Sequence, residues 1–123
     1  MLTRGDQVPH FAVAATDGAR VAYGDIWQRK NLLLVSLGAE EPDRYAADVS
    51  SLGPRLAEYD TASVVTRDAI PGVPAPGVLI ADRWGEVQAV IERRPSEGPS
   101  ADDLIEWLSY VQRRCPECEG EWR

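Results

Sequence analysis

Two cysteines, Cys115 and Cys118, are the residues of this chain best suited to redox or metal chemistry. They form a Cys-Pro-Glu-Cys motif and are the only cysteines among the 123 residues. A Cys-x-x-Cys pair can close a small disulfide ring, so the first interpretation is a dithiol that is reversibly oxidised and reduced. Cys118 is the more accessible candidate nucleophile, because Cys115 directly follows a predicted helix whose dipole disfavours a thiolate.

Two other interpretations of the cysteine pair stay open. A structural zinc ion needs four ligands, and the motif supplies two. The other two would come from His10, from carboxylates, or from the same motif of a second chain, which would make a homodimer. In the third interpretation both cysteines are structural, as free thiols or as a disulfide that fixes the tail while Trp122 packs back on the domain.

Composition limits the range of functions. The chain is long enough for one domain with a single core. Its net charge of -7 argues against a nucleic-acid partner and against an anionic membrane surface. Apolar runs such as Leu32 to Val35 are far too short to span a bilayer. The N-terminal residues contain no apolar signal region, so we expect a cytoplasmic protein.

Hydrophobic periodicity and turn residues predict an alternation of strands and helices. The predicted helix after residue 42 should break at Gly53-Pro54, because proline cannot continue a helix. Ser100 precedes two acids, which is typical of a helix start. The predicted strands are 11–14, 20–23, 31–37, 62–66, 77–81 and 86–91, and the predicted helical segments are 24–30, 42–59 and 101–114.

A proline-rich segment precedes the apolar strand at 77–81. Pro71, Pro74 and Pro76 must lie at or before the edge of that strand, because proline cannot donate to a sheet ladder. The Ala75-Pro76 bond is also a place where a cis peptide would be tolerated. The turn Asp82 to Gly85 then leads into the next strand as a hairpin.

These features resemble the thioredoxin superfamily, in particular its redoxin or peroxiredoxin branch (the alkyl hydroperoxide reductase and thiol-specific antioxidant group). The opening pattern rests on Gly5, Pro9, Phe11, Asp17 and Gly18, and Pro76 takes the cis-proline position. The resemblance implies an α/β thioredoxin-like fold. It has a central mixed β-sheet flanked by helices, an N-terminal β-hairpin and a shortened connection before the cis-proline strand. We expect residues 1–114 to form this domain and 115–123 to be a tail that carries the Cys-x-x-Cys motif.

The resemblance also shows what is missing. Redoxins place a reactive cysteine after the first central strand, and in this chain Glu41 and Arg44 take the two positions of that motif. Peroxide reduction needs a thiolate, so peroxidase chemistry is not expected there. The implied function is thiol-disulfide or antioxidant chemistry with a redox partner protein, carried by Cys115 and Cys118. The alternative is a non-catalytic binding or assembly module.

The connection 67–75 is too short for the helix that most redoxins have at this point. Such a loop must cross the edge of the sheet where redoxin active sites open. We therefore expect it to cover part of the pocket beside Pro76.

Overall fold

The centre of the molecule is a four-stranded mixed sheet. The structure is a computed structural model that describes residues 1–38, 44–94 and 97–113. Strands β3 (Asn31–Ser36), β4 (Thr61–Thr66), β5 (Gly77–Ala81) and β6 (Val87–Glu92) lie in the order β4-β3-β5-β6. β3 and β4 are parallel, while the β3–β5 and β5–β6 pairs are antiparallel. Each predicted strand is confirmed to within one residue at either end.

The two inner strands, β3 and β5, are buried along their whole length. Successive side chains of a strand point to opposite faces of the sheet, so each inner strand contributes to two cores. Leu33 and Ile80 belong to the core on one face, and Leu32 and Leu79 belong to the core on the other. This double burial explains why the sequence has continuous apolar runs here rather than alternation.

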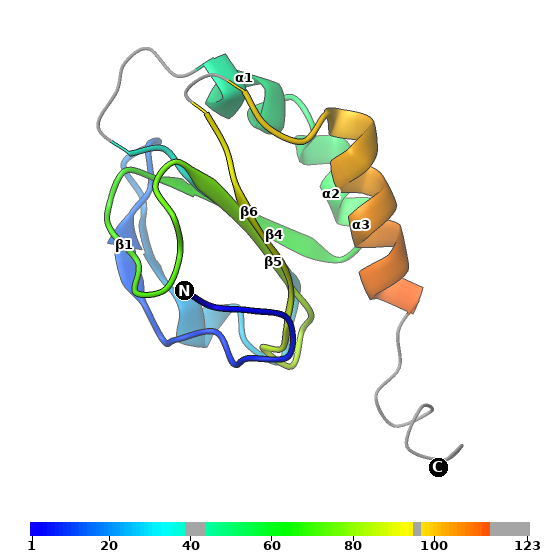
Figure 1. Ribbon diagram of the computed structural model, residues 1–123. Helices are drawn as coiled ribbons and strands as arrows, with labels where there is room; N and C mark the ends of the chain where they lie inside the picture. The colour runs from blue at the N-terminus through cyan, green and yellow to red at the C-terminus, as the bar shows by residue number, and fades with distance from the viewer. Residues whose placement is uncertain (39–43, 95–96, 114–123) are drawn as a thin grey trace.

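Three helices cover one face of the sheet. They are α1 (Arg44–Ser50), α2 (Gly53–Glu58) and α3 (Ala101–Arg113) (Figure 1). The predicted break at Gly53-Pro54 is confirmed, since both residues lie in the first turn of α2. The Ser100 hydroxyl accepts a hydrogen bond from the Asp103 amide at 3.1 Å, and the Asp103 carboxylate accepts one from the Ser100 amide at 3.4 Å. α3 therefore begins with a reciprocal cap, as its sequence predicts.

The N-terminal part of the chain covers the opposite face. The hairpin of β1 (Ala12–Ala14) and β2 (Arg20–Ala22) leads into the short 3-10 helix η1 (Tyr23–Asp25), followed by turns up to residue 30. The predicted helical turn at 24–30 is therefore shorter and starts one residue earlier. The described connection between β4 and β5 contains no helix. Phe11, Val13, Tyr23 and Ile70 fill this face instead.

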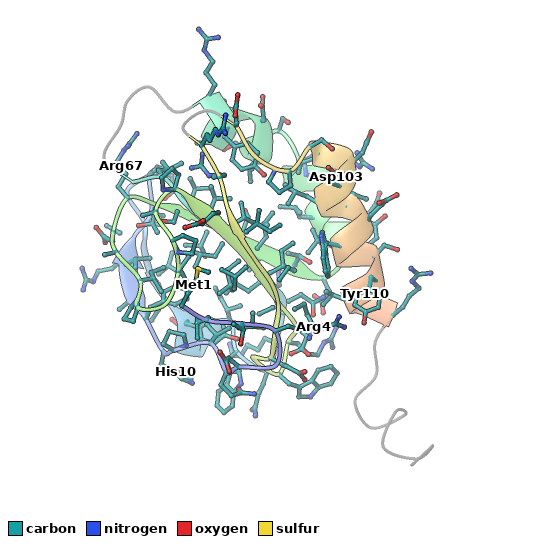
Figure 2. All side chains as sticks on the ribbon, viewed as in Figure 1. Met1, Arg4, His10, Arg67, Asp103 and Tyr110 are labelled. Atoms are coloured by element: carbon teal, nitrogen blue, oxygen red, sulfur yellow. The ribbon has the colours of Figure 1, made fainter. Side chains whose placement is uncertain are left out.

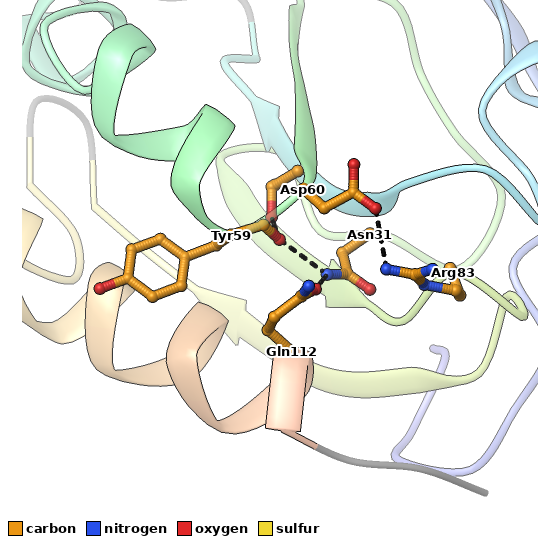
Figure 3. A network of polar contacts seen from close by, with 6 residues as sticks. Asn31, Tyr59, Asp60, Arg83 and Gln112 are labelled. Carbon is orange, nitrogen blue, oxygen red and sulfur yellow. Dashed lines mark hydrogen bonds and ion pairs between the residues drawn. The ribbon is translucent and has the colours of Figure 1, made fainter. Parts of the chain in front are cut away.

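A polar network fastens the end of α3 to the start of β3. The Asn31 amide nitrogen donates to the Gln112 side-chain oxygen at 2.7 Å and to the Tyr59 carbonyl at 3.0 Å (Figure 3). Beside it, the Arg83 guanidinium forms an ion pair with Asp60 at 2.8 Å. Because Asn31 is almost completely buried, these bonds fix which end of the sheet the C-terminal end of α3 reaches.

Tyr23 gives a prediction about pH. Its hydroxyl is buried and has no hydrogen-bond partner within the described ranges. Burial, with a smaller contribution from the Asp82 carboxylate, raises the pKa of Tyr23 to about 12. Below pH 10 or so the phenol is neutral in both the folded and the unfolded state. Between about pH 10 and 12 only the unfolded chain releases the proton, so the free energy of unfolding falls by roughly 2 kcal/mol in this window.

We expect Tyr23→Phe to remove this part of the pH dependence, measured by urea denaturation across the alkaline range. At neutral pH the variant should be as stable as the wild type or up to about 1 kcal/mol more stable, because an unsatisfied buried hydroxyl is lost. Tyr59→Phe, at a half-exposed tyrosine, is the matched control. An unchanged alkaline slope in Tyr23→Phe would contradict the assignment.

Candidate functional site

The candidate site lies at the edge of the sheet where β3, β4 and β6 end and β5 begins. Because β3, β4 and β6 run in the same direction, the residues that follow them meet at one edge. Gly38 follows β3, Arg67 follows β4 and Arg93 follows β6, while Pro76 precedes β5. This is the edge at which open α/β sheets commonly bind ligands.

Pro76 lies at the middle of this edge. The Ala75–Pro76 peptide bond is cis, which is the geometry expected at the position the sequence assigns to it. Gly38 faces this bond with a positive φ of 72°, and a Cβ atom there would lie 3.4 Å from the Ala75 carbonyl and the Pro76 nitrogen. The Arg67 guanidinium donates to the Gly38 carbonyl at 3.3 Å. The positive φ therefore favours glycine at position 38, while a Cβ atom would make only ordinary contacts there.

Arg93 is the buried cation of the site. Its side chain is only 8% exposed, and it donates to the Ser36 carbonyl at 2.8 Å and to the Glu97 carbonyl at 3.4 Å. The guanidinium lies over the Tyr45 ring, 4.9 Å from the ring centroid. Arg93 therefore ties the ends of β6, β3 and α1 together and places a positive charge at this edge.

A hollow of about 460 Å³ opens beside Pro76. It is lined by Pro74, Ala75, Pro76, Glu92, Arg93 and Arg94. Pro74 and Ala75, at the end of the connection 67–75, form part of its wall, and the expectation that this connection covers part of the pocket stays a prediction. The middle of the connection is held against the core, because Ile70 is buried there and the Leu2 amide donates to the Gly72 carbonyl at 2.8 Å.

The other residues singled out by the sequence lie apart from this hollow or outside the described residues. Arg44 is the first residue of α1 and is exposed. Glu41, Cys115 and Cys118 lie outside the described residues, and so does the tail 115–123. His10 is exposed and contacts the edges of the Tyr23 and Trp27 rings.

The described residues contain no candidate metal-binding group. No group of three or more His, Cys, Asp or Glu side chains there is arranged to hold a metal ion. None of the described helices is long and apolar enough to cross a membrane.

Sequence reasoning missed Arg93, Ser36 and Tyr45. A signal for Arg93 was present, because Arg93 and Arg94 directly follow the strand that ends beside Pro76. The hydroxyl of Ser36 is buried without a hydrogen-bond partner in the described part of the chain. The site thus offers positive charge and a buried hydroxyl, and its described residues include no thiol.

Comparisons with known proteins identify the fold. No family model matches the sequence, and no curated protein matches it. The reduced 2-Cys peroxiredoxin of Plasmodium vivax superposes with a TM-score of 0.73 at 12% identity, covering 89% of this chain and 81% of that chain. AhpC of Mycobacterium bovis gives 0.70 at 16% identity, covering 91% and 98%. A yeast mitochondrial 1-Cys peroxiredoxin gives 0.71 at 12% identity, covering 91% and 77%. The thioredoxin-like α/β fold predicted from the sequence, which is the fold of these peroxiredoxins, is confirmed.

We expect Arg93→Lys to lower the free energy of unfolding by about 2 kcal/mol, because an ammonium cannot reproduce the forked bonds and the stacking on Tyr45. Arg94→Lys, at the exposed neighbouring position, should change it by less than about 0.5 kcal/mol. Urea denaturation of both variants measures the difference. Equal effects of the two substitutions would show that Arg93 does not join the strand ends.

Proposed function

We propose that this chain, which has the peroxiredoxin fold, is a thiol-disulfide oxidoreductase with an antioxidant role and that Cys115 and Cys118 form its dithiol. The observation that carries the proposal is the distribution of cysteine. The strand ends around Pro76 contribute arginines, a glycine and a serine, and the only two cysteines of the chain stand together beyond α3. Residues 39–43, which follow β3, are Ala-Glu-Glu-Pro-Asp.

The position of α3 supports a dithiol that acts apart from Pro76. Gln112 is bound to Asn31, the first residue of β3, whereas Gly38 and Pro76 lie beyond its last residue, Ser36. A strand of this length spans about 17 Å. α3 therefore ends, at Arg113, toward the opposite end of the sheet from Pro76, and the two cysteines follow it in the sequence.

The proposed reaction is a two-electron exchange. The thiolate of Cys118 attacks one sulfur of a substrate disulfide and forms a mixed disulfide, and the other substrate sulfur leaves as a thiol after taking up a proton. The thiolate of Cys115 then attacks the Cys118 sulfur and releases the second substrate thiol. The substrate disulfide is reduced to two thiols, and Cys115–Cys118 is oxidised to a disulfide. A partner protein with its own dithiol returns the pair to the reduced state.

We expect Cys115→Ser to accumulate a mixed disulfide with oxidised glutathione, because the resolving thiol is gone. Cys118→Ser should form little of this adduct, and the double variant should form none. Intact-protein mass spectrometry of the untagged chain measures the adducts, and circular dichroism checks that each variant is folded. Reduction of insulin disulfides by the wild type should be lost in all three variants.

The alternative function, a non-catalytic module, predicts different results in native mass spectrometry and in the insulin assay. If the chain is a non-catalytic module, native mass spectrometry should find zinc held by the cysteines across a homodimer, or two thiols that never pair. In either case the wild type would not reduce insulin, and the oxidoreductase proposal would be wrong.

A further inference from the structure

An apolar and acidic groove lies between α3 and the outer side of β6, the last strand of the sheet. This edge is distinct from the strand ends beside Pro76. The volume of the groove is about 400 Å³, and it is lined by Ile91, Pro99, Asp103, Glu106, Trp107 and Tyr110. The four α3 residues recur at three- and four-residue spacing and therefore form one stripe of the helix. Trp107 and Tyr110 meet edge to face, with ring centroids 6.1 Å apart, and Tyr110 is 37% exposed.

The edge of β6 beside this groove is open from Ala89 to Glu92. Over that stretch β6 pairs with β5 on its inner side, and no described segment pairs with it on the outer side. Such an edge presents backbone donors and acceptors that can accept an added strand. Four strand residues extend for roughly 13 Å, close to the roughly 10 Å from Asp103 to Tyr110 along α3, so edge and groove match in length.

The chain itself shows what this edge can bind. Residues Gly5 to Val8 pair with 85–87, of which Val87 is the first residue of β6, and the Gly5 amide donates to the Val87 carbonyl at 2.9 Å. The preceding residue, Arg4, donates to the Tyr110 hydroxyl at 2.8 Å and lies over the Tyr110 ring, 5.9 Å from its centroid. Figure 2 shows Arg4 beside Tyr110, with Asp103 toward the other end of α3. On the N-terminal side of Gly5 the chain turns away from the edge: the Asp6 amide donates to the Thr3 carbonyl, and the Leu2 amide donates to the Gly72 carbonyl.

We propose that the open edge Ala89–Glu92 and the groove beside it bind a basic, extended segment of a partner protein. The segment would add a strand to β6, with its arginine side chains on the acidic and aromatic stripe of α3 and its alternate side chains turned to the other face of the sheet. Arg4 occupies one end of this surface in the same manner. Among its described lining residues the groove has two carboxylates and no cation, which favours a cationic occupant.

Charge also argues against a second copy of the chain as the occupant. Edge-to-edge pairing of two copies would bring Glu92, Asp103 and Glu106 of both into one surface. Each copy carries a net charge of -7, so this contact would be repulsive, whereas a basic segment would be attracted.

The test uses the full chain and a capped hexapeptide of alternating arginine and valine. We expect amide shifts in two-dimensional NMR spectra to concentrate at 89–92 and 103–110. Glu106→Lys should weaken binding about tenfold, while Glu58→Lys, the same charge change at an exposed site on α2, should weaken it by less than about threefold. A peptide with N-methylated valines keeps the charge but loses strand donors, so it should bind at least about tenfold more weakly. The Cys115→Ser, Cys118→Ser double variant should bind like the wild type, because neither cysteine takes part.

Four results with the peptides would overturn the proposal. They are no binding at about 1 mM peptide, shifts centred elsewhere, equal binding of the N-methylated peptide, and equal effects of the two lysine substitutions. Sedimentation equilibrium completes the test. A wild-type dimer that Glu106→Lys disrupts would assign this edge to a second copy instead of a basic partner.

Discussion

The fold depends on the burial of β3 and β5 on both faces. A strand buried in this way must be covered on both faces, because exposing the apolar side chains of either face to water is unfavourable. The three helices supply one cover. The hairpin β1–β2, η1 and the connection that contains Ile70 supply the other. The proline-rich connection thus packs on that face through Ile70, and its last residues, Pro74 and Ala75, line the hollow beside Pro76.

The strand order concentrates chemistry at one edge. Three strands end where β5 begins, so residues from four separate segments meet at Pro76. In this chain those residues carry positive charge and bind backbone carbonyl groups. Arg93 is bound to carbonyl groups and stacked on Tyr45, and Arg67 is bound to the Gly38 carbonyl. The proposed redox motif follows α3 in the sequence, and the Asn31–Gln112 bond holds the C-terminal end of α3 at the other end of the sheet.

The outer edge of β6 lies apart from the strand ends beside Pro76, and the side chains next to it are acidic and aromatic rather than basic. The N-terminal segment covers its first residue, Val87, and leaves Ala89 to Glu92 open beside acidic and aromatic side chains of α3. A protein of this fold can therefore separate a redox function in one segment from partner recognition on another. The two proposals involve no common residue, so each stands or fails independently.

The resemblance to redoxins implied the thioredoxin-like fold. The sequence alone determined the strands, the break at Gly53-Pro54 and the capped start of α3. These features follow from local periodicity, proline geometry and capping chemistry, which act between residues close in the chain. It also determined that the only thiols are Cys115 and Cys118. Only the tertiary structure decided that Arg93 joins Ser36 and Tyr45 and that Pro74 and Ala75 line a hollow together with Arg93. It alone also showed that Arg4 lies on Tyr110 beside an open edge. Those contacts join residues far apart in the chain, and strand order, which no local pattern encodes, brings them together.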